Sequence, residues 1–158
     1  MRRRFACAWL LLATLGALAA PAAHAQAFFC TAGTTGVAFG TYTPLTPVPL
    51  ASTGSVTVQC FIVFGTASAT IDLSTGASGS FMARTLTNGT NTLQYNLYLN
   101  AAHTQVWGDG SGGSLINMLT LTAGFNSTAT ATVYGAVYAL QDPVPGGYAD
   151  TITVTVNY

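Results

Sequence analysis

Short stretches in which apolar and polar residues alternate run through most of this sequence. In the last of them, Ile152, Val154, Val156 and Tyr158 alternate with Thr or Asn residues. A period of two places every apolar side chain on the same face of an extended strand, so the pattern predicts a half-buried β-strand. Six further segments alternate in this way, the last three more weakly: 56–60, 69–73, 93–99, 37–42, 118–122 and 130–139. No segment after residue 25 shows a convincing 3.6-residue apolar period, and we therefore predict an all-β chain.

Clusters of Pro, Gly and Asn residues separate the predicted strands. These clusters are Pro44, Pro47 and Pro49, then Gly76 and Gly79, then Asn88 and Gly89, then the segments 108–113 and 143–147. Such residues favour tight turns over continuous strands. Strands joined in this way, in a chain of 158 residues, predict a single antiparallel β-sandwich of the immunoglobulin-like type.

The N-terminal 25 residues have the organisation of a signal peptide. Three arginines, at positions 2–4, precede an apolar run over residues 5–20, and Ala23-His24-Ala25 follows as a cleavage pattern. We therefore predict a signal peptide over 1–25 and a domain over 26–158, with a cut after Ala27 as an alternative. The apolar run is too short for a comfortable membrane span and no second one follows, so we expect export without membrane insertion.

Few charged residues remain once residues 1–25 are removed. Arg84 is then the only cation, against Asp72, Asp109, Asp142 and Asp150, which gives a formal charge of −3. Binding of nucleic acid needs several clustered cations, so we expect no nucleic-acid partner. The same inventory is poor for acid–base chemistry, and we expect no catalytic residue, no cofactor and no metal site. A triad of His103, Asp109 and a serine can be drawn, but we favour reading 108–113 as a flexible loop.

Two cysteines remain after the signal peptide, Cys30 and Cys60. In an exported chain of this size we predict that they form one disulfide.

The aromatic residues allow two interpretations. Trp107, Tyr95, Tyr134 and Tyr138 either pack in the core of the sandwich or form a sugar-binding surface, and we favour the core. Arg84 and Asp150 are candidates for an ion pair, in which the only remaining cation has a structural role.

Six short motifs follow one another along the chain. They are Phe39-Gly40-x-Tyr42, Ser55-Val56-Thr57-Val58-x-Cys60, Tyr95-Asn96-Leu97-Tyr98, Trp107-Gly108-Asp109-Gly110, Tyr134-Gly135-Ala136-Val137 and Gly147-Tyr148-x-Asp150-Thr151-Ile152-x-Val154-x-Val156. In this order the chain resembles the spore coat protein U domain family, which includes subunits of archaic, Csu-type chaperone–usher pili. The resemblance covers essentially all of residues 26–158.

The resemblance implies an incomplete immunoglobulin-like sandwich that is completed by a donor strand from a partner. The implied partners are a periplasmic pilus chaperone, an outer-membrane usher and neighbouring fibre subunits. The implied function is that of a structural subunit, secreted through the periplasm to a surface fibre or coat, that supports adhesion or biofilm formation. Because the last alternating stretch ends with no residues left to cover its far edge, we expect Ile152, Val154, Val156 and Tyr158 to contact the chaperone or the donor strand.

The chain departs from the pilin pattern at its expected mature N-terminus. Subunits that donate a strand carry about a dozen alternating residues before the first cysteine, whereas only residues 26–29 precede Cys30 here. We therefore expect a subunit that accepts a strand, in a tip or terminating position, or a coat protein. The alternative hypothesis is a soluble carbohydrate-binding β-sandwich or adhesin domain.

Overall fold

The computed structural model describes residues 29–158, so the predicted signal peptide lies outside the described residues. The described chain consists of antiparallel strands and one short 3-10 turn. In chain order the elements are β1 (Phe29–Thr35), β2 (Leu50–Leu73), η1 (Gly76–Ser78), β3 (Thr85–Asn88), β4 (Asn91–Tyr98), β5 (Asn117–Val137) and β6 (Val154–Asn157). The prediction of an all-β antiparallel fold is confirmed. Residues 29–158 include no helix of the length and apolar character that a membrane crossing requires.

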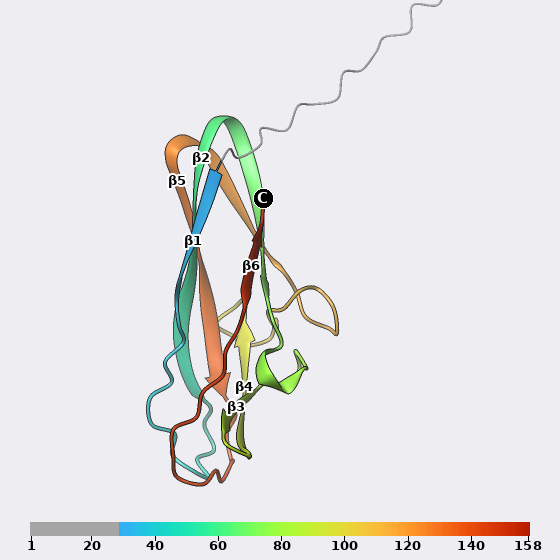
Figure 1. Ribbon diagram of the computed structural model, residues 1–158. Coiled ribbons are helices and arrows are strands. Elements are labelled where there is room, and N and C mark those ends of the chain that lie inside the picture. Colours follow the sequence, from blue (N-terminus) through green and yellow to red (C-terminus); the bar gives the residue numbers. More distant parts are fainter. Residues whose placement is uncertain (1–28) are drawn as a thin grey trace, which may run out of the picture.

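Strands β2 and β5 form one long ribbon that bends over at one end of the molecule (Figure 1). They pair antiparallel from Leu50 opposite Val137 to Ile71 opposite Asn117. The register shifts twice, between Cys60 and Ile62 and between Ile62 and Thr66. Such bulges increase the local twist and bend a strand, which explains why the ribbon folds over in this region.

The other strands attach to the two arms of this ribbon. The sheet order is β1-β2-β5-β4-β3, and β6 also pairs with β2. Strand β1 pairs with the first half of β2, from Thr35 opposite Ser55 to Phe29 opposite Phe61. Strand β6 pairs with the last four residues of β2, Thr70–Leu73. Each of the two long strands therefore contributes to both layers of the sandwich.

The core lies between the two layers and follows the predicted alternation. Val58, Ala69 and Ile71 are completely buried, and so is Trp107, whose indole Nε1–H donates to the Ile71 carbonyl at 2.8 Å. Tyr95 is also buried, and Tyr134 and Tyr138 are half-buried. The aromatic residues thus pack in or against the core, as we favoured from the sequence.

The strand boundaries differ from the predictions in three ways. The predicted strands 56–60 and 69–73 are both parts of β2. The predicted strands 118–122 and 130–139 fall largely within β5. Each pair forms one continuous strand because bulges, and not turns, bend the ribbon between them. Segment 37–42 is irregular. Strands β1 and β3 were not predicted, since neither alternates clearly. The predicted turn at Asn88 and Gly89 is confirmed, because Asn88 pairs with Asn91 across a two-residue loop between β3 and β4.

A disulfide joins the first strand to the ribbon. Cys30 lies directly opposite Cys60 in the pairing of β1 with β2, and their sulfur atoms are bonded. The predicted pairing is therefore present. It fixes β1 at the edge of the sheet close to the bend.

We predict that reducing this disulfide destabilises the domain substantially. A closed loop of about 30 residues restricts the unfolded chain, and the entropy model assigns it roughly 3.7 kcal/mol. Urea unfolding of the exported protein, with and without reductant, measures the change in the free energy of unfolding. Reductant should have no effect on a variant with both Cys30→Ala and Cys60→Ala. Two free thiols in the native exported protein, counted by alkylation and mass, would contradict the prediction.

Candidate functional site

An apolar groove lies between the end of β1 and the start of β6. Residues 34–37 and Phe39 line one side of it, Ile152 and Val154 line the other, and its volume is about 230 Å³. Several further lining side chains belong to the hydrophobic core: Val56, Leu73, Tyr95, Leu97 and Val133. Core side chains thus form the floor of the groove.

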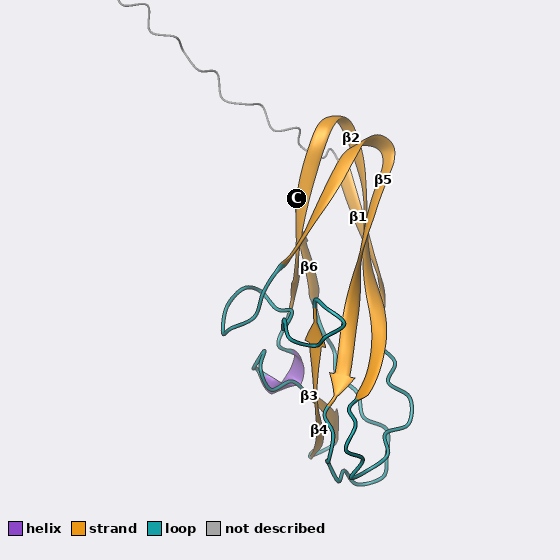
Figure 2. Ribbon diagram, turned by 180° about the vertical axis from the view of Figure 1, so that it is seen from behind, coloured by secondary structure: helices purple, strands orange, loops and turns teal. Residues whose placement is uncertain are grey.

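A second cavity, of about 740 Å³, continues the groove toward the end of the molecule opposite the bend. It lies between the irregular segments 37–42 and 143–150, and Figure 2 shows that loops gather at this end. Both cavities are lined by Val37, Phe39, Leu86 and Asp150. We call the two cavities together the groove.

The strands beside the groove have unpaired edges. Within the described residues, β1 and β6 each pair with β2 alone. One edge of each strand therefore presents backbone N–H and C=O groups without a strand partner, and such groups can pair with an added strand. The groove thus combines an apolar lining with two edges that are open to hydrogen bonding.

The first wall of the groove, formed by residues 34–37 and Phe39, is held close to β5. A Cβ atom at Gly135 would lie 2.7 Å from Val37 Cγ1 and 2.8 Å from Phe39 Cζ, so only glycine allows the wall to approach this closely. The Phe39 ring then meets Tyr95 edge-on, with ring centroids 5.8 Å apart. The predicted strand over 37–42 is wrong, because this segment lies across the sandwich and does not join a sheet.

Asp150 anchors the second wall of the groove, formed by Ile152 and Val154, through hydrogen bonds just before β6. Its Oδ2 accepts a hydrogen bond of 2.7 Å from the Tyr95 hydroxyl, and its Oδ1 accepts bonds from the amides of Ala77 (2.9 Å) and Thr151 (2.8 Å). Burial raises the pKa of the Tyr95 hydroxyl well above its ordinary value, and the bond to Asp150 adds to this effect. The Tyr95 hydroxyl is therefore a permanent donor, and the carboxylate ties β4 and η1 to the groove wall.

Two further contacts hold the same wall. The Ser74 amide donates to the Thr153 carbonyl at 2.9 Å, and the Thr153 amide donates to Ser74 Oγ at 2.9 Å. Nearer the loop, Thr87 and Ala149 exchange backbone hydrogen bonds of 2.8 and 3.1 Å. The path that leads into β6 is thus fixed by short contacts before the strand begins.

Arg84 is fully buried below this wall. Its guanidinium donates to the carbonyls of Ser74 (2.7 and 3.2 Å) and Trp107 (2.8 Å) and to Asn96 Oδ1 (2.9 Å). Burial lowers the pKa of Arg84, while nearby Tyr95 and Asp150 oppose the shift. No direct ion pair joins Arg84 to Asp150 in the described chain. Arg84, the only cation of residues 26–158, instead donates all of these hydrogen bonds to uncharged carbonyl and amide oxygens. These bonds link four segments of the chain.

The structure does not assemble the alternative catalytic triad. His103 packs on Tyr98, with ring centroids 5.1 Å apart, whereas the exposed Asp109 carboxylate accepts hydrogen bonds from the amide and hydroxyl of Ser111 at 2.8 and 2.6 Å. These bonds lower the pKa of Asp109. No hydrogen bond joins His103 to Asp109, and no group of three potential metal ligands occurs within residues 29–158.

The residues predicted as the partner interface separate into two groups. Ile152, Val154 and Val156 are half-buried against the core, and the first two line the groove. Tyr158 is 62% exposed and lines neither cavity. The role of these residues in partner binding stays a prediction.

Comparison with known proteins places this architecture in a family. A model of the Spore Coat Protein U domain matches residues 15–155. The chain belongs to the spore coat protein U domain family. The resemblance that we derived from the six motifs is thereby confirmed.

Two matches extend the family assignment. The chain is 33% identical over 133 residues to "Protein U" of Myxococcus xanthus, and the match covers 76% of this chain and 70% of that protein. It is also similar to a crystal structure of the CsuC–CsuE chaperone–tip adhesion subunit pre-assembly complex from the archaic chaperone–usher Csu pili of Acinetobacter baumannii. That match has a TM-score of 0.51 and 20% identity, and it covers 82% of this chain but 40% of that chain. At this identity the similarity concerns the fold.

Several residues that build the groove in this family member were not identified from the sequence. Ser74 stands in no pattern that the sequence analysis used, whereas Gly76 was identified only as a turn residue and Asn96 only as part of the motif Tyr95-Asn96-Leu97-Tyr98. Asp150 stands in the motif Gly147-Tyr148-x-Asp150, and this motif was a usable signal. The partner of Asp150, Tyr95, lies 55 positions away in the chain, and no local pattern connects the two residues.

We predict that Gly76→Ala destabilises the domain far more than Gly79→Ala. Both glycines have a positive φ, 67° and 69°, so each substitution costs about 1 kcal/mol in backbone strain. At Gly76 the new Cβ would also overlap the Asp150 carboxylate, whereas nothing lies within 4 Å of a Cβ at Gly79. Displacing the carboxylate adds roughly 2 kcal/mol. Urea unfolding of both variants measures the difference, and equal effects would contradict the proposed role of Asp150.

Proposed function

We propose that this protein is an exported structural subunit of a chaperone–usher surface fibre or coat, and that a strand from a partner fills its groove. The observation that carries the proposal is the groove itself, an apolar hollow floored by core side chains between the unpaired edges of β1 and β6. Membership of the spore coat protein U family and the fold shared with a Csu pilus subunit support it. A partner strand can pair with an edge and place alternate side chains in the groove.

The energetics favour a subunit that depends on its partner. Four or five anchoring side chains, at about 1.5–3 kcal/mol each, contribute roughly 6–15 kcal/mol. This range equals the stability of an entire domain. The chain without a partner strand is therefore barely stable, and a periplasmic chaperone is the partner that protects it before an outer-membrane usher passes it to its neighbours.

The position of the subunit in an assembly follows from the predicted signal peptide. With cleavage after Ala25, only residues 26–29 precede Cys30, and so short a segment cannot fill the groove of a neighbour. We therefore propose that the chain accepts a strand at a tip or terminating position. A role in adhesion or biofilm formation belongs to the same proposal.

The alternative of a carbohydrate-binding domain has less support. Sugar recognition through aromatic rings requires accessible faces, but Trp107 and Tyr95 are 0% and 3% exposed. The hydrolase alternative lacks an assembled triad in residues 29–158, because His103 and Asp109 contact different partners.

Donor-strand fusion tests the proposal directly. We expect that fusing a donor strand from a neighbouring subunit after Tyr158, through a flexible linker, yields a soluble monomer without a chaperone. The unfused chain, residues 26–158, should aggregate or melt at a much lower temperature. A fusion with the donor residues scrambled is the control. If the unfused chain is equally soluble and melts cooperatively, the sandwich is complete and the carbohydrate-binding alternative takes precedence.

We further predict that a charge on the groove face of β6 blocks strand uptake. Val154→Asp places a carboxylate among apolar lining residues. Burying this charge beneath an added strand, with no hydrogen-bond donor or cation beside it, costs several kcal/mol. Thr153→Asp is the matched control, because Thr153 is exposed. Thr155 is unsuitable as a control because it pairs opposite Asp72. The amount of exported protein and the uptake of a labelled donor peptide are the measurements. Equal loss in the two variants would contradict a groove-facing role for Val154.

A further inference from the structure

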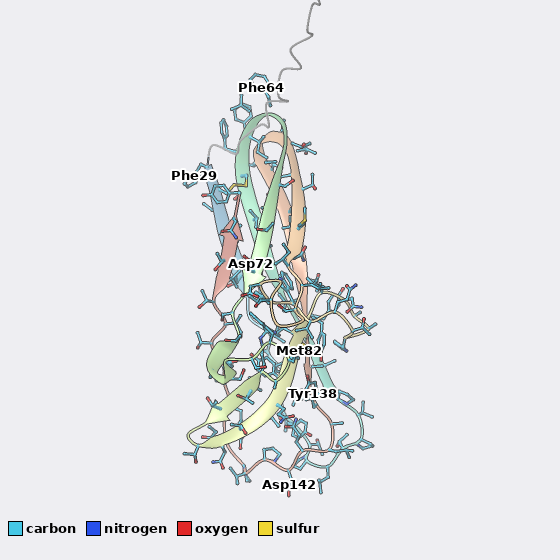
Figure 3. All side chains as sticks on the ribbon, turned by 90° about the vertical axis from the view of Figure 1, so that its right-hand side faces the viewer. Phe29, Phe64, Asp72, Met82, Tyr138 and Asp142 are labelled. Carbon is cyan, nitrogen blue, oxygen red and sulfur yellow. A yellow bond between two sulfur atoms is a disulfide. The ribbon has the colours of Figure 1, made fainter. Side chains whose placement is uncertain are left out.

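The bend of the ribbon carries a cluster of exposed aromatic side chains. Phe29, Phe64 and Phe125 are 65%, 78% and 82% exposed, and Val63 is 46% exposed. Phe61 joins them, because it pairs opposite Phe29 and its ring lies 5.2 Å from that of Phe125. Figure 3 shows Phe29 and Phe64 at the end of the molecule opposite Asp142. We call these five residues the aromatic crest.

The aromatic crest is large for an exposed apolar surface. A phenylalanine side chain presents about 200 Å² when fully exposed, so the three most exposed rings contribute roughly 450 Å². The largest apolar patch of an ordinary monomer covers about 300–600 Å², and patches of this size often mark a contact surface. None of the crest residues lines the groove, so the crest and the apolar lining that the proposed donor strand fills are separate surfaces.

The charge distribution indicates which partner the crest suits. The segments 29–71 and 110–141 contain no Asp, Glu, Lys, Arg or His. The nearest acidic residue along β2 is Asp72, eight positions after Phe64, or roughly 25 Å of strand. Since the exposed charged side chains of residues 29–158 are all acidic, two copies can meet through the crest without like-charge repulsion.

Two other classes of partner suit the crest less well. Binding to an anionic lipid surface relies on Lys or Arg beside the apolar residues, and the crest has neither. A charged protein partner would find no complementary charge there. The crest is instead uncharged and apolar, with four phenylalanines and Val63, and a second copy of the same surface is complementary to it.

We propose that the aromatic crest is a self-association surface, through which two copies of this chain pack crest against crest. A contact of this kind is isologous, with the same residues on both sides. The three rings of both copies bury roughly 900 Å² in total, slightly below the size of a stable complex, so the contact is weak and transient. In an assembled fibre or coat it is a second contact between subunits, in addition to the strand in the groove.

Sedimentation velocity of residues 26–158 carrying the fused donor strand, over a range of concentrations, tests the proposal without aggregation through an empty groove. The wild type should show a sedimentation coefficient that rises with concentration. Phe64→Ser and Phe125→Ser each remove a ring from both copies and should weaken association by roughly 100-fold. Val48→Ser is the control, because Val48 is 65% exposed but lies far from the bend, and it should associate like the wild type. Near-ultraviolet circular dichroism verifies that the variants are folded.

Two additional measurements distinguish self-association from other contacts. An excess of donor peptide, which occupies the groove, should leave crest association unchanged. If the peptide abolishes association while the Phe64 and Phe125 variants still associate, the contact is strand exchange and the proposal is wrong. Flotation with neutral phosphatidylcholine vesicles forms the other arm. The crest binds lipid instead if the wild type stays monomeric and floats with the vesicles, and if Phe64→Ser abolishes this flotation. That result would overturn the proposal.

Discussion

The continuous pairing of β2 with β5 is the interaction on which the rest of this structure depends. Strands β1 and β6 attach to β2, β4 attaches to β5, and β3 attaches only to β4. Because both long strands bend at the same end, one ribbon supplies a strand pair to each layer of the sandwich. The disulfide between Cys30 and Cys60 and the crest residues both lie near this bend, where the ladder is interrupted and side chains are forced outward.

The incomplete sandwich explains why polar contacts are concentrated beside the groove. Within residues 29–158, β1 and β6 each pair with β2 alone, so no strand supports the groove walls from their open edges. Asp150, Tyr95 and Ser74 fasten the wall that leads into β6, and Gly135 allows the other wall to lie against β5. Arg84 joins the loops below. Both walls of the groove are therefore held in place by contacts within the domain.

Parts of the candidate site could be predicted from the sequence, whereas others could not. The alternation at 152–158 correctly indicated a strand with Val154 and Val156 turned toward the core, although β6 itself is shorter. The pairing of Cys30 with Cys60 was predicted from the cysteine count and the expected export, and the structure shows it. The possible ion pair between Arg84 and Asp150 did not form, because carbonyl and amide oxygens close to Arg84 satisfy it first. Which oxygen reaches a buried guanidinium depends on the packing of four distant segments.

The sequence by itself determined the strand character, the turn at Asn88 and Gly89 and the family, and it favoured a buried Trp107. These properties depend on local periodicity, on turn residues and on motif order, and each can be read over a few positions. The tertiary structure alone decided that segments 56–60 and 69–73 form one bent strand, that 37–42 becomes a groove wall, and that Asp150 meets Tyr95. Alternation specifies which face of a strand points inward but not which strand lies beside it. Neighbours are chosen by the packing of the whole domain, so the groove and the aromatic crest exist only once the ribbon has bent.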